Sequence, residues 1–106
     1  MRDAAARRAR FLAGLAVVAA ALAALWPVLG NGFTNYDDDE YVTANFHVQD
    51  GLSWSGLTWA CTTLHAGNWH PLTWLSHMLD VELFGLRPAG HHLVSLALHA
   101  GNTLLL

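Results

Sequence analysis

An uncharged apolar run near the N-terminus is the strongest constraint on what this 106-residue chain can fold into. The run Phe11–Gly30 reads FLAGLAVVAAALAALWPVLG and contains no charged residue. As a helix rising about 1.5 Å per residue, it would reach roughly 30 Å, the thickness of a bilayer's hydrocarbon core. We therefore expect a transmembrane helix, with Trp26 at the membrane interface and Pro27 and Gly30 near its end.

The residues that flank this run predict its orientation. Four arginines precede it within residues 1–10, whereas the rest of the chain is acidic, so the positive-inside rule places the N-terminus in the cytoplasm. A cleaved signal peptide is the alternative, but its apolar region usually has about 7–15 residues and is followed by a small-residue cleavage site. Here the small-residue triplets lie inside the apolar run. We therefore favour an uncleaved helix in the inner (plasma) membrane, within a multi-pass protein.

Composition excludes several other classes of protein. Only 12% of the residues are charged and 54% are hydrophobic, whereas a soluble domain has about 25% charged residues. These values argue against a disordered chain and against a free-standing soluble enzyme. No basic patch accompanies the aromatic residues, so the expected partner is a lipid bilayer and not a nucleic acid. Cys61 is the single cysteine, which excludes a disulfide within the chain.

A second apolar segment, residues 91–106, ends the printed sequence. As a helix it would reach about 24 Å, short of a full span, and it closes on three leucines without a capping residue. We expect an incomplete second transmembrane helix, and we interpret the chain as the N-terminal piece of a larger polytopic protein. His92, Ser95, His99 and Asn102 share one face of this helix, as expected for a polar stripe that either lines a site or bonds a neighbouring helix.

Residues 31–90 are expected to form the first extracytoplasmic loop, with short amphipathic helices. Ser53 is a candidate cap for a helix that runs through WSGLTWACTTL. Pro71 suits the first turn of another helix, capped by Asn68 or His70, and Gly85 with Pro88 would end it. The predicted fold class is therefore all-α, that of a membrane protein.

The helix that begins at Pro71 has two unlike faces. Its apolar face carries leucines and its polar face carries hydrogen-bonding side chains: Leu72, Leu75, Leu79 and Leu83 on the first, and His70, Thr73, His77 and Asp80 on the second. Together with the tryptophans of this segment, such helices suit a membrane surface among the headgroups. A small helical cap packed on the rest of the protein is the alternative, and the two interpretations are compatible.

An acidic run, Asp37-Asp38-Asp39-Glu40, follows the first apolar helix closely. Adjacent carboxylates repel one another and attract metals or cationic partners, and one at a membrane face can act as a general base. The alternatives are a solvated loop or a capping box formed by Asp37 and Glu40.

Seven histidines raise the question of a metal site. His91-His92 is an adjacent pair, and His70 and His77 lie two helical turns apart, but neither matches the H-E-x-x-H or Cys-x-x-Cys spacing common in zinc sites. We therefore assign no metal ligand from the sequence, and leave a divalent metal open as a cofactor.

Residues 33–106 resemble a known family of bacterial membrane proteins. The most specific part is NWHPLTWLSHMLD, residues 68–80, preceded by NYDDDEYV. The segment is similar to the N-terminal region of multi-spanning proteins with C-terminal tetratricopeptide repeats. These are related to the transmembrane-and-tetratricopeptide-repeat O-mannosyltransferases of the GT-C glycosyltransferase class. Asp39 departs from the family's pattern, in which proline is frequent at this position.

The resemblance implies a reaction and a set of site residues. A GT-C transferase takes its sugar from a polyprenyl-phosphate donor and passes it to a protein hydroxyl or another acceptor. An acidic residue soon after the first membrane helix serves this chemistry, which selects Asp37 and Asp38 as candidate general bases. His70, His77, Arg87 and His91 are the candidate ligands of the lipid phosphate. We expect this segment alone to be inactive, because the bundle that holds the donor is missing.

A second hypothesis is a non-catalytic membrane anchor and scaffold. In that case tetratricopeptide repeats outside this segment would bind other proteins. Eight or more further helices would favour the transferase, whereas repeats that begin after one or two helices would favour the scaffold.

Overall fold

The computed structural model describes residues 1–106, apart from the side chain of Arg2, and is all-α, as predicted. The long helices are α1 (Arg2–Leu25), α4 (Pro71–Phe84) and α5 (Pro88–Leu105). Between them lie shorter elements: η1 (Trp26–Gly30), η2 (Asp39–Thr43), α2 (Phe46–Gln49), α3 (Trp54–Thr62) and η3 (His65–Gly67). No β-strand occurs among the described residues.

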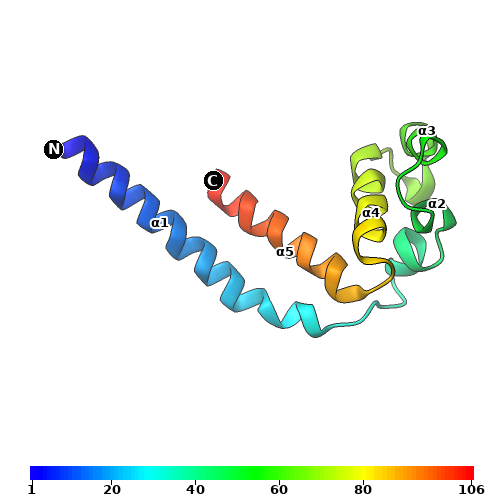
Figure 1. Cartoon of the computed structure of the whole chain (residues 1–106), viewed down its shortest axis with the longest axis horizontal. Helices are drawn as coiled ribbons and strands as arrows, with labels where there is room; N and C mark the ends of the chain where they lie inside the picture. The colour runs from blue at the N-terminus through cyan, green and yellow to red at the C-terminus, as the bar shows by residue number, and fades with distance from the viewer.

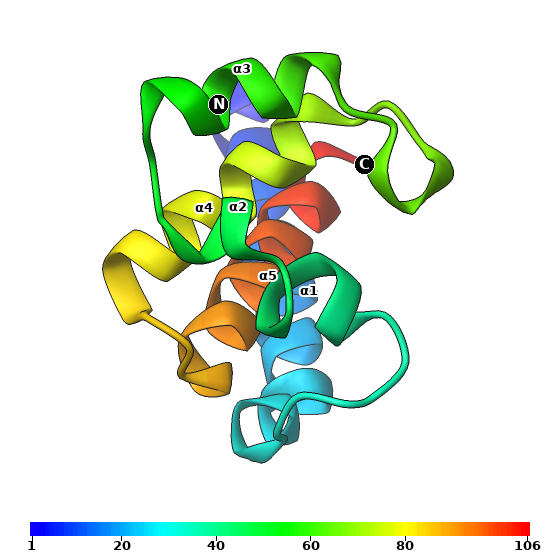
Figure 2. The same ribbon diagram turned by 90° about the vertical axis from the view of Figure 1, so that its right-hand side faces the viewer.

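Two of the helices, α1 with its continuation η1 and α5, form a long arm, and the elements from η2 to α4 form a compact lobe at its end (Figure 1). The helix α5 runs back along α1, so that both ends of the chain lie away from the lobe. A view from the lobe side shows α2, α3 and α4 in front of the two long helices (Figure 2). The loop of residues 31–90 is therefore a folded lobe with elements of its own.

The first apolar helix begins before its expected start at Phe11, and its last five expected residues form a 3₁₀ turn. It begins at Arg2, and its α-helical part ends at Leu25, where the chain tightens into the 3₁₀ turn η1. Pro27 is in the first turn of η1, where its missing N–H leaves no α-helical bond to break. Among the described residues, the continuous segment Asp3–Gly30 is the one long and apolar enough to cross a membrane, a test that signal sequences also pass.

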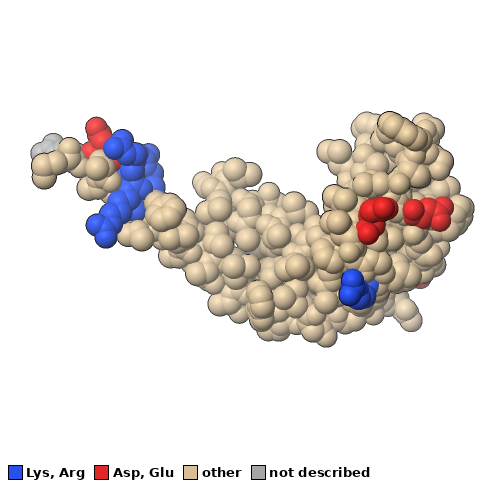
Figure 3. Space-filling view, in the orientation of Figure 1, with Lys and Arg blue, Asp and Glu red and all other residues tan. Residues whose placement is uncertain are grey.

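The charges on the surface are segregated along the arm. Figure 3 shows arginine side chains gathered at the N-terminal end of α1, followed by a largely uncharged surface along α1 and α5. The apolar side chains of α1 are exposed, Phe11 and Leu15 among them, and the apolar window of this helix has no buried residue. A surface of this kind suits a lipid environment.

The lobe is built around a small core. Val48, Ala60, Trp74 and Met78 are buried, and Tyr41 stacks on the Trp74 indole with ring centroids 4.8 Å apart. Full burial of one apolar side chain such as methionine stabilises the folded state by about 1.5–3 kcal/mol. The core fixes α4 as the central element against which the shorter elements pack.

Local capping chemistry sets the helix boundaries in the lobe. The Ser53 hydroxyl accepts a hydrogen bond from the Gly56 N–H at 2.9 Å, which confirms the predicted cap of α3. The helix α4 begins at Pro71 and stops at Gly85, whose φ of 61° is a left-handed conformation that favours glycine. The next helix starts at Pro88, three residues before the expected start at His91.

The helix α4 buries apolar and polar side chains together: Trp74 and Met78 lie in the core, and Asp80 is buried beside them in sequence. Leu72, Leu79 and Leu83 are exposed, whereas Asp80 is buried. Asp80 meets His91 of α5, and three of the four leucines expected on the apolar face point outward, whereas Leu75 packs against the core. This arrangement fits a lobe that rests on a membrane surface, the first of the two compatible interpretations given above.

Gly90 sets the distance between α4 and α5. A Cβ atom at this position would collide with the ring of Phe84. We expect Gly90→Ala to lower the free energy of unfolding by about 1–3 kcal/mol, because the added methyl group overpacks the contact. Denaturant titration in detergent micelles, followed by far-ultraviolet circular dichroism, measures this change.

Gly101→Ala is the matched control, because Gly101 is in the same helix with nothing within 4 Å of the added methyl group. This substitution should be neutral or stabilising by about 0.5–1 kcal/mol. Equal effects at the two positions would contradict the close contact at Gly90.

Candidate functional site

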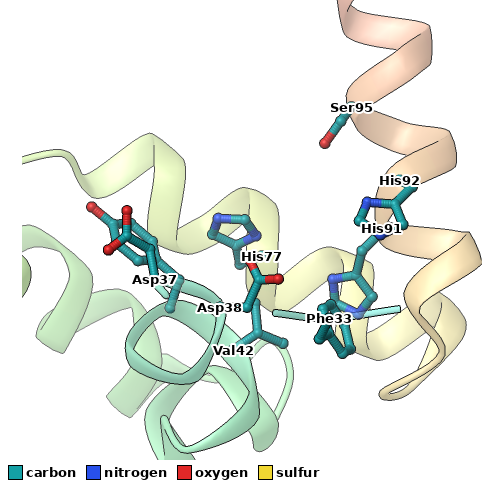
Figure 4. A pocket seen from close by; sticks show the side chains of 9 residues that line it. Phe33, Asp37, Asp38, Val42, His77, His91, His92 and Ser95 are labelled. Atoms are coloured by element: carbon teal, nitrogen blue, oxygen red, sulfur yellow. The ribbon is translucent and has the colours of Figure 1, made fainter. Parts of the chain in front are cut away.

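A cavity of about 290 Å³ opens where the segment after α1 meets α4 and α5. Figure 4 shows side chains from these three parts of the chain around it. Two carboxylates and three imidazoles are among them, and the lining residues are Phe33, Asp37, Asp38, Tyr41, Val42, His77, His91, His92 and Ser95. Carboxylates and imidazoles thus face the same cavity. The imidazole nitrogens can act as metal ligands or as hydrogen-bond donors.

The carboxylates of this cavity differ in their surroundings. Asp37 is exposed, whereas Asp38 is half-buried, and its Oδ2 accepts a hydrogen bond from the Thr34 N–H at 2.7 Å. The Glu40 N–H donates to Asp39 Oδ1 at 2.9 Å, so the capping box expected as an alternative for Asp37 and Glu40 is replaced by a contact between neighbours. Asp38 is therefore held in a fixed orientation, and Asp37 is free to meet a ligand.

The element that follows the two carboxylates is the π-helical turn η2. Its characteristic bond runs from the Ala44 N–H to the Asp39 carbonyl at 2.8 Å, one residue longer than in an α-helix. Tyr41, inside this turn, stacks on Trp74 of the core. The turn therefore ties the carboxylate segment to α4.

The polar face of α4 contributes His77 and Asp80, one helical turn apart. His77 Nδ1 lies 3.8 Å from Asp80 Oδ2. Burial lowers the pKa of His77, and the nearby His91 lowers it further, while Asp38 opposes both. Burial raises the pKa of Asp80, and His91 opposes this shift. His77 is therefore held toward its neutral form, in which a ring nitrogen is free to act as a ligand.

The first turn of α5 contributes His91 and His92. The Nε2–H of His91 donates to the Gly85 carbonyl at 2.8 Å, and its ring meets Phe33 edge-on at 5.3 Å between centroids. His92 Nε2 lies 3.4 Å from the carbonyl oxygen of Gly32. These contacts connect the start of α5 to the chain just beyond α1.

Four of the six residues selected from the sequence come together here. Asp37, Asp38, His77 and His91 all line the cavity. The fifth, His70, packs its ring against Trp74 at the start of α4, with centroids 5.0 Å apart. The sixth, Arg87, is exposed beside a separate hollow, and its Nε–H donates to the Phe84 carbonyl at 3.1 Å.

Three further residues of the site were not among the six selected from the sequence as catalytic or phosphate-binding candidates. His92 and Ser95 belong to the expected polar stripe of the second apolar segment, and both line the cavity. Asp80 is buried beside His77 and His91. The position of Asp80 on the polar face of α4 was the one sequence signal for its role. Helical spacing within α4 does not reveal that α5 packs against this face, because that is a tertiary contact.

The comparisons with known proteins add no identity. No protein-family model, no curated protein and no solved structure matches this chain. The geometry of the cavity and the resemblance of the sequence motifs are therefore the grounds for the proposal that follows.

Proposed function

We propose that this chain carries the acceptor-activating part of an integral-membrane glycosyltransferase. The donor would be a polyprenyl-phosphate sugar, and the acceptor a protein hydroxyl or another lipid-linked sugar. The observation that carries this proposal is the gathering of Asp37, Asp38 and three histidines around one cavity. The resemblance to the GT-C transferases with tetratricopeptide repeats selects this function among those that such a cavity could serve.

The position of the cavity supports a substrate that lies in the bilayer. Asp37 and Asp38 follow Gly30, the last residue of the apolar segment, by seven and eight positions. The contact between His92 and Gly32 holds the start of α5 against this same end of the arm. A lipid-linked donor would thus present its phosphate and sugar near the carboxylates.

The proposed reaction needs a base on one side and a stabilised leaving group on the other. A carboxylate at position 37 or 38 takes the proton of the acceptor hydroxyl, and the oxygen of that hydroxyl attacks the anomeric carbon of the donor sugar. The bond between this carbon and the phosphate oxygen breaks, and polyprenyl phosphate leaves with the electron pair. The configuration is inverted, by analogy with inverting glycosidases. His77 and His91 line the same cavity as candidate ligands of the departing phosphate, and the neutral His77 ring has one N–H to donate to it.

The charge distribution supports an orientation for the membrane span. The arginines precede the apolar segment, so we propose a cytoplasmic N-terminus and an extracytoplasmic lobe, in a multi-pass protein of the inner membrane. The exposed tryptophans and leucines of the lobe favour contact with the headgroups: Trp54, Trp69, Leu72 and Leu83.

The same exposed apolar residues also support the second hypothesis, a membrane anchor and scaffold without catalysis. In that case the lobe would dock on lipid or on other parts of the protein, and the carboxylates would be dispensable. Substitution of the carboxylates separates the two hypotheses.

Cysteine labelling tests the orientation. In a Cys61→Ser background, which removes the exposed native thiol, Asp50→Cys should react with a membrane-impermeant maleimide in intact bacterial spheroplasts. Ala4→Cys should react only after the membrane is permeabilised. The reverse pattern would show that the lobe is cytoplasmic.

Substitution of the acidic residues tests the catalytic role. In the protein as produced from its own gene, Asp37→Asn or Asp38→Asn keeps the side chain's size but removes its basicity. Transfer of radiolabelled mannose from a polyprenyl-phosphate donor to membrane proteins should fall by about 10²–10⁴-fold at the position of the base.

Asp39→Asn is the matched control, because Asp39 bonds its neighbour and does not line the cavity. Its transfer rate should remain that of the unmodified protein. If transfer is unchanged in both the Asp37 and Asp38 variants at equal expression, the carboxylates are not the base and the scaffold hypothesis gains.

A further inference from the structure

One ligand atom from each of His77, Asp80 and His91 lies within 4.8 Å of the other two. His77 and Asp80 share a face of α4 because they are three residues apart. His91 reaches them from the first turn of α5, after the chain reverses at Gly85. Two of the distances are known: the Nδ1 atoms of His77 and His91 are each 3.8 Å from Asp80 Oδ2.

The burial of this cluster distinguishes it from a surface group of charges. Asp80 is 4% exposed and His91 is 5% exposed. Among the described residues, the Nδ1 atoms of His77 and His91 are buried without a hydrogen-bond partner. Buried polar atoms in proteins are nearly always paired, and a positively charged or hydrogen-bonding species between these two nitrogens and the buried carboxylate would pair them.

The tautomer of His91 indicates which species fits. Its Nε2 bonds the Gly85 carbonyl, which only accepts, so Nε2 carries the hydrogen. In the neutral ring, Nδ1 then presents a lone pair toward Asp80. Metal-binding histidines commonly donate their second ring N–H to a backbone carbonyl in this way, which fixes both the tautomer and the direction of the lone pair.

We propose that His77, Asp80 and His91 form a binding site for a divalent first-row transition metal, with zinc as the best fit. Two imidazoles and one carboxylate are a ligand set of catalytic zinc sites and of non-haem iron sites, whereas magnesium and calcium prefer oxygen ligands. In a tetrahedral zinc site the ligand atoms lie about 3.3 Å apart. Small side-chain rotations would bring the ligand atoms of these three residues from their present separations of up to 4.8 Å to that distance.

The site leaves one coordination position for a molecule in the cavity. His77 and His91 are also lining residues of the cavity that contains Asp37 and Asp38. A metal with three protein ligands keeps a fourth position for water or a substrate oxygen. Metal binding by these residues does not depend on the proposed transferase activity, and it is measured with the metal alone.

Zinc titration of the metal-stripped 106-residue chain in detergent micelles, followed by calorimetry, tests the proposal. We expect one zinc ion per chain. His77→Gln, Asp80→Asn and His91→Gln should each weaken binding by at least about 100-fold, because loss of even an outer-sphere partner costs 10–100-fold. Excess magnesium should not displace the zinc.

His99→Gln is the matched control, because His99 is exposed on α5 and is outside the cluster. Its zinc affinity should equal that of the unmodified chain. Circular dichroism checks the fold of each variant. If the two buried positions do not tolerate substitution, His77→Gln decides alone, because the side chain of His77 is 28% exposed.

X-ray absorption at the zinc edge gives an independent readout. Imidazole scattering with Zn–N distances of about 2.0–2.1 Å would support the assignment. Absence of zinc binding, displacement by magnesium, equal affinity in all variants, or a zinc shell without imidazole would each overturn it.

Discussion

The close approach of α5 to the end of α4 is the contact on which the candidate site depends. Gly90 allows the first turn of α5 to lie against Phe84, and Gly85 supplies the left-handed turn that reverses the chain. The hydrogen bond from His91 to the Gly85 carbonyl then closes this corner. Without the corner, His91 would not face Asp80, and the cavity would lose its wall on the side of α5. Two small residues therefore determine the positions of the larger chemical groups.

The site also depends on α1, although this helix provides no lining side chain. The exposed surface of α1 suits lipid, and α5 packs along this helix. The contact of His92 with Gly32 ties the segment that follows η1 to α5. The carboxylates, the imidazoles and the apolar segment thus come from separate parts of the chain and meet at one end of the arm. Under the proposed function, this is the place where the phosphate and sugar of a lipid-linked donor would lie.

Features set by neighbouring residues could be predicted from the sequence, and features set by tertiary contacts could not. Ser53, Pro71 and Gly85 marked helix boundaries correctly, because capping and φ preferences act within a few residues. Four of the six site candidates lie around one cavity, and these were selected from motif resemblance as well as from residue type. The burial of Asp80 could not be predicted, because it depends on packing against a helix that begins beyond the next turn. The same contact turns His77 and His91 from isolated histidines into neighbours.

The π-helical turn η2 makes the length of this segment part of the site. Its bond from Ala44 to Asp39 accommodates one residue more than an α-helical turn would. Each residue of a helix adds about 100° of rotation. Deletion of one residue between positions 39 and 43 would allow an ordinary turn, but it would rotate the preceding carboxylates away from the cavity or pull Tyr41 off Trp74. Related chains could therefore exchange residues within this turn more readily than they could gain or lose one.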